Sequence, residues 1–365
     1  MRVGPAPPST IDRTGFDAFA RSIPSATLSI TLSVRVFIFS GRFSGTIETL
    51  PFSSSRTTGS PIGLSFGAFG VGRVGYAREM DPLLNVRPLP GAPFGVEILD
   101  AKLATLLSPD AMDAWHAQLA EHQLVVFREL ALEAEEQVTL LATLGEPLVE
   151  NPAGRLYQFV SNTHNEGILG DERFAYHSDH AFMDVPIDVI SLYGLEVPDT
   201  GTSTRFVNGV TAARALPADL REKLEGRRAR HSIDPDGRHE DVAVRGPRRP
   251  AEAIHAFHPM LWSVSRNPDP VLYVSEQQSD LVEGLDEAES VALIERAFAH
   301  LYADDFSYAH RWREADLVLW DNRALQHARD AVPAGASRNL RRVSIGGTSV
   351  FEYFRDVVGW DGDAS

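Results

Sequence analysis

The sequence predicts a mixed α/β fold that is mainly β, a sandwich or barrel with helices packed on its outside, over residues 80–365. Short runs of β-branched and aromatic residues recur along this part of the chain. Turns rich in Pro, Gly and Asp separate them, and helical periodicity is confined to a few stretches. The expected strands lie at residues 124–127, 156–160, 189–195, 204–207, 230–233, 271–274, 317–320 and 340–345.

Four stretches have the spacing of apolar residues that is typical of helices. Ser108, Pro109 and Asp110 supply an N-cap, a proline at the first helical position and an early acid, so a helix is expected over residues 111–122. The other helices are expected at 133–144, 217–224 and 287–301. No internal repeat or second linker divides residues 80–365, and we therefore expect one domain there.

Residues 1–79 differ in composition from the rest of the chain. They hold 20 Ser or Thr, and eight Arg against four acidic residues. A secretory signal fits poorly, because the apolar part lies far from the start and is broken by Arg35. An organelle transit peptide is an alternative that Asp12 and Asp17 weaken. We expect a disordered or non-native N-terminal extension, with Met80 as a candidate native start.

The composition of the 365-residue chain argues against several classes of protein. A net charge of −16 opposes broad nucleic-acid binding, which needs a basic surface. No apolar run approaches the roughly 18 residues that span a bilayer, and we expect a cytoplasmic protein. Because the chain has no cysteine, disulfides, thiolate metal sites and cysteine nucleophiles are excluded. Any bound metal must be held by nitrogen and oxygen.

The densest cluster of histidines lies at residues 176–180, with the sequence YHSDH. Side chains alternate along a strand, so His177 and Asp179 are expected on one face and His180 on the other. An imidazole beside a carboxylate is half of a site for a divalent cation. His327, after an expected strand, is the best candidate for the third ligand. Two histidines and one carboxylate would leave three positions open for substrates.

Simpler interpretations of these residues exist. A bare His-x-Asp more often marks a surface turn than a ligand pair, and the distant His327 followed by two arginines shifts the balance toward a metal site. Arg338 and Arg342, four apart on one strand, would by default be a solvated pair. His255 and His258 would form a second metal pair only on a helix, which the proline after them opposes.

The whole arrangement resembles the TauD/TfdA family of Fe(II)- and 2-oxoglutarate-dependent dioxygenases, from about Val86 to Gly347. His177, Asp179 and His327 match the iron ligands of that family. The resemblance implies a double-stranded β-helix (jelly-roll) core with flanking helices. It also implies that 2-oxoglutarate and O2 are converted to succinate and CO2 while a small substrate is oxidised. Retention of the carboxylate ligand favours hydroxylation, because related halogenases have that position vacated.

Further positions carry the resemblance. Arg338, eleven residues after His327, matches the arginine that pairs with the far carboxylate of 2-oxoglutarate, and Thr204 matches the threonine that hydrogen-bonds the same group. Arg342 matches an arginine that meets an anionic substrate in several members. The Trp-Asp-Asn-Arg run at 320–323 and His258 with the proline after it are further landmarks.

The resemblance also bears on the substrate. Arg342 favours an anion such as a sulfonate, a carboxylate or a sulfate ester. Residues 161–174 are expected to form part of a lid, and Tyr176, Arg173 and Asn162 are the other expected substrate contacts. Arg173 and Ala181 depart from the residues at these positions in taurine-using relatives, which argues against taurine.

Two other functions compete with the dioxygenase. One is a non-catalytic metal- or ligand-binding jelly roll, and the other is a hydrolase whose metal activates water. The hydrolase leaves Thr204 and Arg338 unexplained and has no evident general base. We therefore predict a dioxygenase that uses Fe(II), 2-oxoglutarate and O2. Its expected partner is a small-molecule substrate, without nucleic acid or membrane, and a homo-oligomer is compatible with the sequence.

Overall fold

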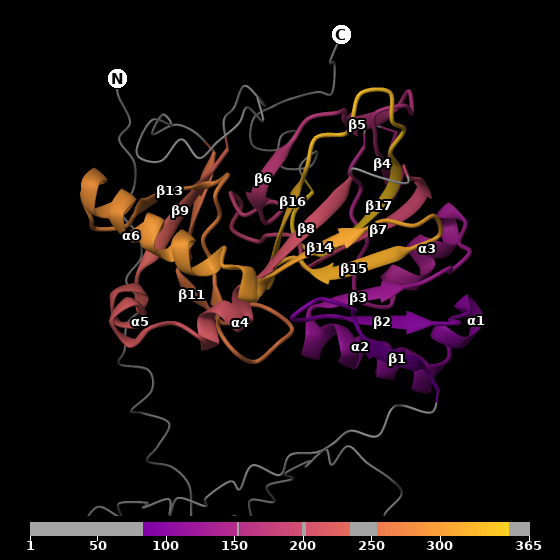
Figure 1. Ribbon diagram of the computed structural model, residues 1–365, viewed down its shortest axis with the longest axis horizontal. Coiled ribbons are helices and arrows are strands. Elements are labelled where there is room, and N and C mark those ends of the chain that lie inside the picture. Colours follow the sequence, from indigo (N-terminus) through magenta and orange to yellow (C-terminus); the bar gives the residue numbers. More distant parts are fainter. Residues whose placement is uncertain (1–82, 152, 199–201, 234–253, 350–365) are drawn as a thin grey trace, which may run out of the picture. The chain divides into compact units, whose positions relative to one another are not determined.

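The computed structural model describes residues 83–151, 153–198, 202–233 and 254–349 (Figure 1). The expected extension at residues 1–79 lies outside these ranges. Within them the chain forms many short strands and few helices, which confirms the mainly β class. No helix in the described ranges has both the length and the apolar character that crossing a membrane requires.

The larger of the two sheets that build the site has eight strands, in the order β1-β2-β3-β15-β7-β17-β4-β5. Most of its neighbours are antiparallel, and only β2–β3 and β4–β5 run parallel. The strands are β1 (Asn85–Pro88), β2 (Val96–Leu99), β3 (Leu124–Phe127), β4 (Gln158–Ser161), β5 (Gly167–Leu169), β7 (Val189–Glu196), β15 (Leu317–Asp321) and β17 (Asn339–Ile345).

The smaller sheet has the order β14-β8-β16-β6, and all its pairs are antiparallel. Its strands come from distant parts of the sequence: β6 (Phe174–His177), β8 (Ser203–Asn208), β14 (Ser307–Arg311) and β16 (Leu325–Arg329). In the register of β16 with β6, His327 lies directly opposite His177. In the register of β16 with β8, Arg329 lies opposite Thr204.

Helices cover the outer face of the large sheet. The first three are α1 (Leu103–Leu106), α2 (Pro109–His122) and α3 (Ala134–Ala142). Pro109 is the first residue of α2, as expected, but the Ser108 hydroxyl donates to the Thr105 carbonyl at 2.7 Å instead of capping the helix. The N-cap of α3 is Glu133, which forms a reciprocal capping box with Glu136.

Alternate side chains of β15 pack on opposite faces of the large sheet, which therefore separates two hydrophobic cores. Leu317 and Leu319 pack in a buried cluster with side chains of α2 and α3. Val318 and Trp320 point the other way and pack in a second buried cluster, which includes Phe206 of the smaller sheet. Helices therefore cover one face of the large sheet, and the other face shares a core with the smaller sheet. The site opens within this second layer.

A third group of elements forms its own core beside the two sheets (Figure 1). It consists of α4 (Gly209–Arg214), α5 (Ala218–Leu224), α6 (Glu287–Leu301), a 3₁₀ turn (Asp304–Phe306) and two small sheets. The strands of these sheets are β9 (Arg228–Ser232), β10 (His255–Pro259), β11 (Leu261–Trp262), β12 (Val271–Leu272) and β13 (Ser279–Val282).

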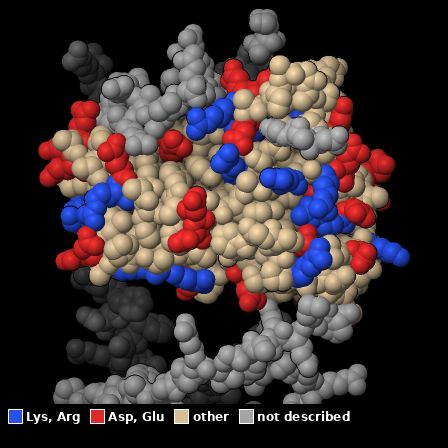
Figure 2. Space-filling model, viewed as in Figure 1, with Lys and Arg blue, Asp and Glu red and all other residues tan. Residues whose placement is uncertain are grey.

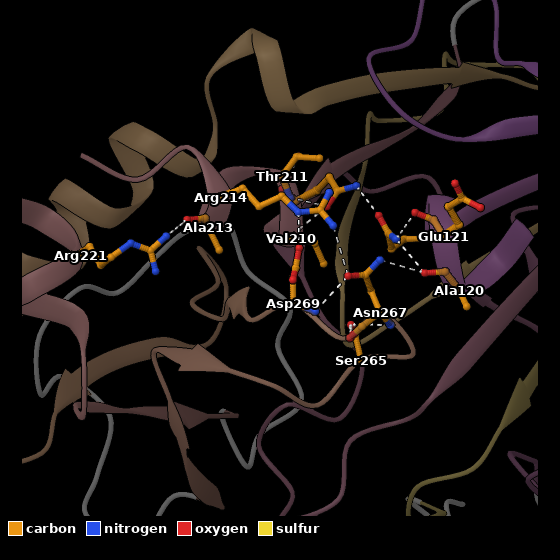
Figure 3. Close-up of polar contacts among 12 residues, drawn as sticks. Ala120, Glu121, Val210, Thr211, Ala213, Arg214, Arg221, Ser265, Asn267 and Asp269 are labelled. Atoms are coloured by element: carbon orange, nitrogen blue, oxygen red, sulfur yellow. Dashed lines mark hydrogen bonds and ion pairs between the residues drawn. The ribbon is translucent and has the colours of Figure 1, made fainter. Parts of the chain in front are cut away.

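Buried polar contacts join this third group to the end of α2 (Figure 3). Asn208 caps α4 by accepting from the backbone N–H groups of Val210 and Thr211, and its amide donates to the Gln123 side chain at 2.9 Å. Asn267 donates to the Ala120 carbonyl at 3.1 Å. Because Asn208 ends β8, these contacts fix one end of a site-forming strand.

The surface carries acidic and basic side chains interspersed over the face in Figure 2. Several form exposed ion pairs, such as Arg205 with Asp330 and Arg214 with Asp269. Pairs of this kind contribute little to stability, because solvent screens them. They differ in this respect from the buried charges described below.

Candidate active site

Three potential metal ligands meet at one end of the smaller sheet. His177 ends β6, Asp179 follows two residues later, and His327 is the middle residue of β16. The pairing of β6 with β16 places the two imidazole rings 4.2 Å apart, measured between centroids. One potential ligand atom from each of the three residues lies within 4.8 Å of the others. Positions separated by 148 residues in the sequence therefore share one site.

Asp179 does not lie on the strand of His177, so the reason that we gave for their common orientation is wrong. β6 ends at His177, and His180 adopts a left-handed backbone with φ of 60°. Asn322 instead holds Asp179: its side-chain oxygen accepts from the Asp179 N–H and its amide donates to the Asp179 carbonyl, both at 3.0 Å. His180 lies within 3.0 Å of the Thr348 carbonyl through Nδ1.

The atoms of the three side chains face one another in a way that suits a cation. His177 Nε2 lies 3.2 Å from Asp179 Oδ1, and His327 Nε2 lies 3.9 Å from Asp179 Oδ2. His177 Nδ1 is 2.9 Å from the Ala175 carbonyl oxygen, which only accepts hydrogen bonds, so Nδ1 carries the proton. In the neutral ring, Nε2 then directs a lone pair at a carboxylate oxygen, and a metal ion held by these two residues would relieve this repulsion.

Electrostatics keeps the ligands in their metal-binding states. Burial lowers the pKa of His327 to about 3, and the neighbouring His177 contributes to the shift, so this ring is neutral near pH 7. Burial alone would raise the pKa of Asp179, but the charge of Arg342, the largest opposing influence, holds that pKa well below its ordinary value. Two neutral imidazoles and one carboxylate are the donor set that suits Fe(II). The residues present therefore fit the ion.

The second feature of the site is a buried arginine without a carboxylate partner. The Arg338 side chain is only 2% exposed, and its Nη2 donates to Thr204 Oγ1 at 3.3 Å. Its Nε and Nη1 have no hydrogen-bond partner among the described residues. Burial, with a contribution from the charge of Arg329, lowers the pKa of Arg338 to about 9. A buried cation with free donors is unfavourable unless an anion binds beside it.

Thr204 is prepared to donate a hydrogen bond. Its oxygen accepts from Trp312 Nε1 at 3.0 Å as well as from Arg338. Because these two donors occupy the acceptor positions of the hydroxyl, its own proton is left for a third group. The guanidinium and this O–H together form a set of donors that matches a carboxylate.

Arg342 is half-buried, and every nitrogen of its guanidinium has a partner among the described residues. Nε donates to Ser344 Oγ at 2.9 Å, Nη1 lies 2.9 Å from Asp179 Oδ2, and Nη2 lies 3.1 Å from Glu150 Oε1. Burial would lower the pKa of Arg342, but the two carboxylates outweigh it and raise that pKa. The two arginines on this strand therefore differ in charge compensation.

A cavity of about 60 Å³ connects these groups. Metal-ligand candidates and arginines give it polar walls, and aromatic and aliphatic side chains cover the rest. The lining residues are Val160, Leu169, Phe174, His177, Asp179, Ile190, Leu192, Thr204, Trp320, His327, Ala328, Arg329, Arg338 and Arg342.

The other expected substrate contacts lie outside this lining. The Tyr176 ring stacks on Tyr302 at 4.8 Å between centroids, and Arg173 is exposed. The amide of Asn162 donates to Asp171 and to the Ala336 carbonyl, and its oxygen accepts from the backbone N–H of Arg338. Asn162 thus fixes the backbone that carries Arg338.

The alternative metal pair is not formed. His255 and His258 lie on strand β10, where the first is exposed and the second buried. His258 Nε2 lies within 3.0 Å of the carbonyls of Ala181 and Met183, just after the ligand turn. His258 therefore supports the turn, and the two histidines belong to no potential metal cluster among the described groups.

Sequence reasoning missed several residues at the site. Arg329 lines the cavity and donates to the carbonyls of Leu169 and Glu172. Strand alternation from His327 could have found it, because i and i+2 share a face. Glu150 and Trp312 have no local signal, since they reach the site only through tertiary packing.

The fold and the site define a class of protein: a mainly β scaffold in which two imidazoles and a carboxylate meet beside a buried arginine that has no carboxylate partner. A sequence profile described as "Taurine catabolism dioxygenase TauD, TfdA family" matches residues 85–344. The chain belongs to this family. It is therefore an enzyme, a dioxygenase that depends on Fe(II) and 2-oxoglutarate, which confirms the prediction made from the sequence.

Individual relatives agree with this assignment. The chain is 29% identical over 275 residues to the alpha-ketoglutarate-dependent 2,4-dichlorophenoxyacetate dioxygenase of Cupriavidus pinatubonensis, covering 68% of this chain and 93% of the relative. It is 25% identical to the pentalenolactone F synthase of Streptomyces avermitilis, with 72% and 94% covered. A crystal structure of a taurine dioxygenase from Burkholderia xenovorans matches with a TM-score of 0.61 at 25% identity, covering 73% and 92%.

Proposed function

We propose that this dioxygenase hydroxylates a small anionic organic substrate and releases succinate and CO2. The observation that carries the proposal is the cavity shared by the His177, Asp179 and His327 cluster and the unpaired, buried Arg338. An iron ion and 2-oxoglutarate, when bound, supply the activation of O2. The chain itself supplies ligands, a carboxylate anchor and a cavity with a largely apolar wall.

In this proposal, His177, Asp179 and His327 hold the iron. Asn322 fixes the backbone of Asp179 on both sides, and the Ala175 carbonyl orients the ring of His177. Such outer contacts determine ligand direction and therefore metal affinity. The neutral state of His327 leaves its lone pairs available at neutral pH.

Arg338 and Thr204 bind the far carboxylate of 2-oxoglutarate. The anion would compensate the buried charge of Arg338, and Thr204 would donate the proton that Trp312 leaves free. A planar guanidinium matches a carboxylate better than an ammonium group does. The keto-acid end of the co-substrate would then lie toward the three metal ligands.

The substrate is proposed to bear an anionic group. A relative named for the dioxygenation of 2,4-dichlorophenoxyacetate supports a carboxylate, and Arg342 lines the cavity beside Asp179. Phe174, Ile190 and Trp320 give the cavity apolar walls, which would exclude water and hold the organic part of the substrate.

Tyr176, Arg173 and Asn162 remain predicted substrate contacts. They lie on β6 or in the segment before it, and Leu169 and Phe174 of the same part of the chain line the cavity. Because none of these three side chains lines the cavity, they would contact a substrate only if it extended beyond the cavity or if the segment that carries them moved.

We also propose that the two sheets are the halves of a jelly-roll core, and that residues 80–365 form the dioxygenase domain. The shared core of the sheets supports the first proposal. The start of the family match at residue 85 supports the second.

The test is an anaerobic titration of the purified protein with Fe(II) and 2-oxoglutarate. We expect a visible metal-to-ligand charge-transfer band, which His177→Ala should abolish; His255→Ala, an exposed histidine outside the site, is the control. A folded wild-type protein without the band would contradict the proposal. A panel of aryloxy acids, sulfonates, alkyl sulfates and amino acids should then include a compound that stimulates succinate release. Activity without O2 would instead indicate a hydrolase.

A further inference from the structure

Glu150 is the residue beside the site whose position the proposed reaction does not explain. It lies in the segment between α3 and β4, is 8% exposed, and does not line the cavity. Its single recorded ion pair among the described residues joins its Oε1 to Arg342 Nη2 at 3.1 Å. Burying a carboxylate costs free energy unless it is paired with a positive charge. We therefore look for the role of Glu150 in its ion pair with Arg342.

Arg342 has two acidic neighbours of different kinds. Asp179 faces Nη1 and belongs to the proposed ligand set, so a bound metal ion would draw on its charge. Glu150 faces Nη2 from outside the cavity lining and contacts no proposed ligand. With metal in place, Glu150 is the carboxylate left to neutralise the guanidinium.

We propose that Glu150 is a specificity-determining residue, which neutralises Arg342 and thereby weakens the binding of oxyanions in the cavity. This inference rests on the proposed function, because it concerns the group that would meet the substrate anion. A substrate carboxylate or sulfate approaching Arg342 meets an ion pair of no net charge rather than a free cation. Anion recognition then depends on direct hydrogen bonding to Arg342 more than on its charge.

The variant Glu150→Gln tests this directly. The amide keeps the shape of the side chain and can still accept a hydrogen bond from Nη2, but it removes the negative charge. We expect affinity for 2,4-dichlorophenoxyacetate and for inorganic sulfate to rise about tenfold, as for the loss of one opposing buried charge interaction. A residue with a merely structural role would lower affinity or leave it unchanged.

The measurement is calorimetric titration of full-length protein with each anion, in the presence and absence of Fe(II) and 2-oxoglutarate. The methyl ester of 2,4-dichlorophenoxyacetate is the neutral probe, and its affinity should not change. Glu283→Gln, which removes the acid of the exposed Arg228–Glu283 pair, is the matched control and should leave all affinities at the wild-type values.

Unchanged or weaker anion binding in Glu150→Gln would overturn the inference, and so would equal gains for the ester. Failure to detect either anion with this variant would overturn it too. These outcomes are distinct from failure of the proposed function, which would show as a missing charge-transfer band in the wild type. Because calorimetry does not depend on the band, the role of Glu150 is decided in either case.

Discussion

Arg338 immediately precedes β17, Arg342 lies in the middle of that strand four positions later, and both line one cavity. Arg342 has an acceptor at each of its nitrogens, two of them carboxylates, whereas Arg338 has the Thr204 hydroxyl and two free nitrogens. Burial acts on both, yet the pKa of Arg338 falls and that of Arg342 rises. Neighbouring carboxylates therefore decide whether an arginine in this cavity keeps an uncompensated charge for an anion, as Arg338 does, or already has its charge balanced by the protein, as Arg342 does.

Replacing Arg342 should have the largest effect on stability. Arg342→Gln leaves the buried carboxylates of Glu150 and Asp179 without their cation, so we expect the metal-free protein to lose about 3 kcal/mol of unfolding free energy. Urea denaturation measures this. Arg205→Gln, at an exposed pair with Asp330, should cost less than about 1 kcal/mol. Equal losses in the two variants would remove the contrast between buried and exposed pairs.

Replacing Arg338 should instead leave stability intact and weaken the binding of 2-oxoglutarate. Arg338→Gln removes an uncompensated buried charge, so stability without ligands should be unchanged or higher. Loss of the charged anchor should weaken 2-oxoglutarate binding about 100-fold, or about 2.7 kcal/mol, as measured by anaerobic titration of the charge-transfer band. Arg338→Lys should recover part of the affinity. A strongly destabilised Arg338→Gln with normal 2-oxoglutarate affinity would show that the two arginines have been assigned the wrong way round.

Replacing Trp312 should have a smaller effect, and only on the binding of 2-oxoglutarate by Arg338 and Thr204. Trp312→Phe removes the donor to Thr204 and frees the hydroxyl to turn, so we expect 2-oxoglutarate to bind about fivefold more weakly, or about 1 kcal/mol. Trp115→Phe is the matched control, because it also removes a buried indole hydrogen bond, to the Leu106 carbonyl, away from the cavity. Its 2-oxoglutarate affinity should equal that of the wild type. A loss in both variants would point to general loosening of the core.

The sequence predicted much of this site because its signals are local. The set of His177, Asp179 and His327 was proposed from residue type and order along the chain, and the family resemblance supported it; Arg338 was expected from that resemblance alone. The expected helix at 287–301 matches α6. Its N-cap Asp286 and its apolar face are formed by residues that are close together in the sequence. Ser108 shows the limit of such signals. Its hydroxyl donates to the Thr105 carbonyl and accepts no capping hydrogen bond from α2.

Residue types and their order were enough to predict the mainly β class. Because the chain has no cysteine, they also limited any metal site to nitrogen and oxygen ligands. Tertiary structure alone decided that Asp179 sits in a turn held by Asn322 rather than on a strand, and that Glu150 rather than solvent faces Arg342. The physical reason is that charge compensation and burial depend on which distant groups come within a few ångströms. No spacing along a chain encodes that distance, so two arginines only four positions apart differ in their charge compensation.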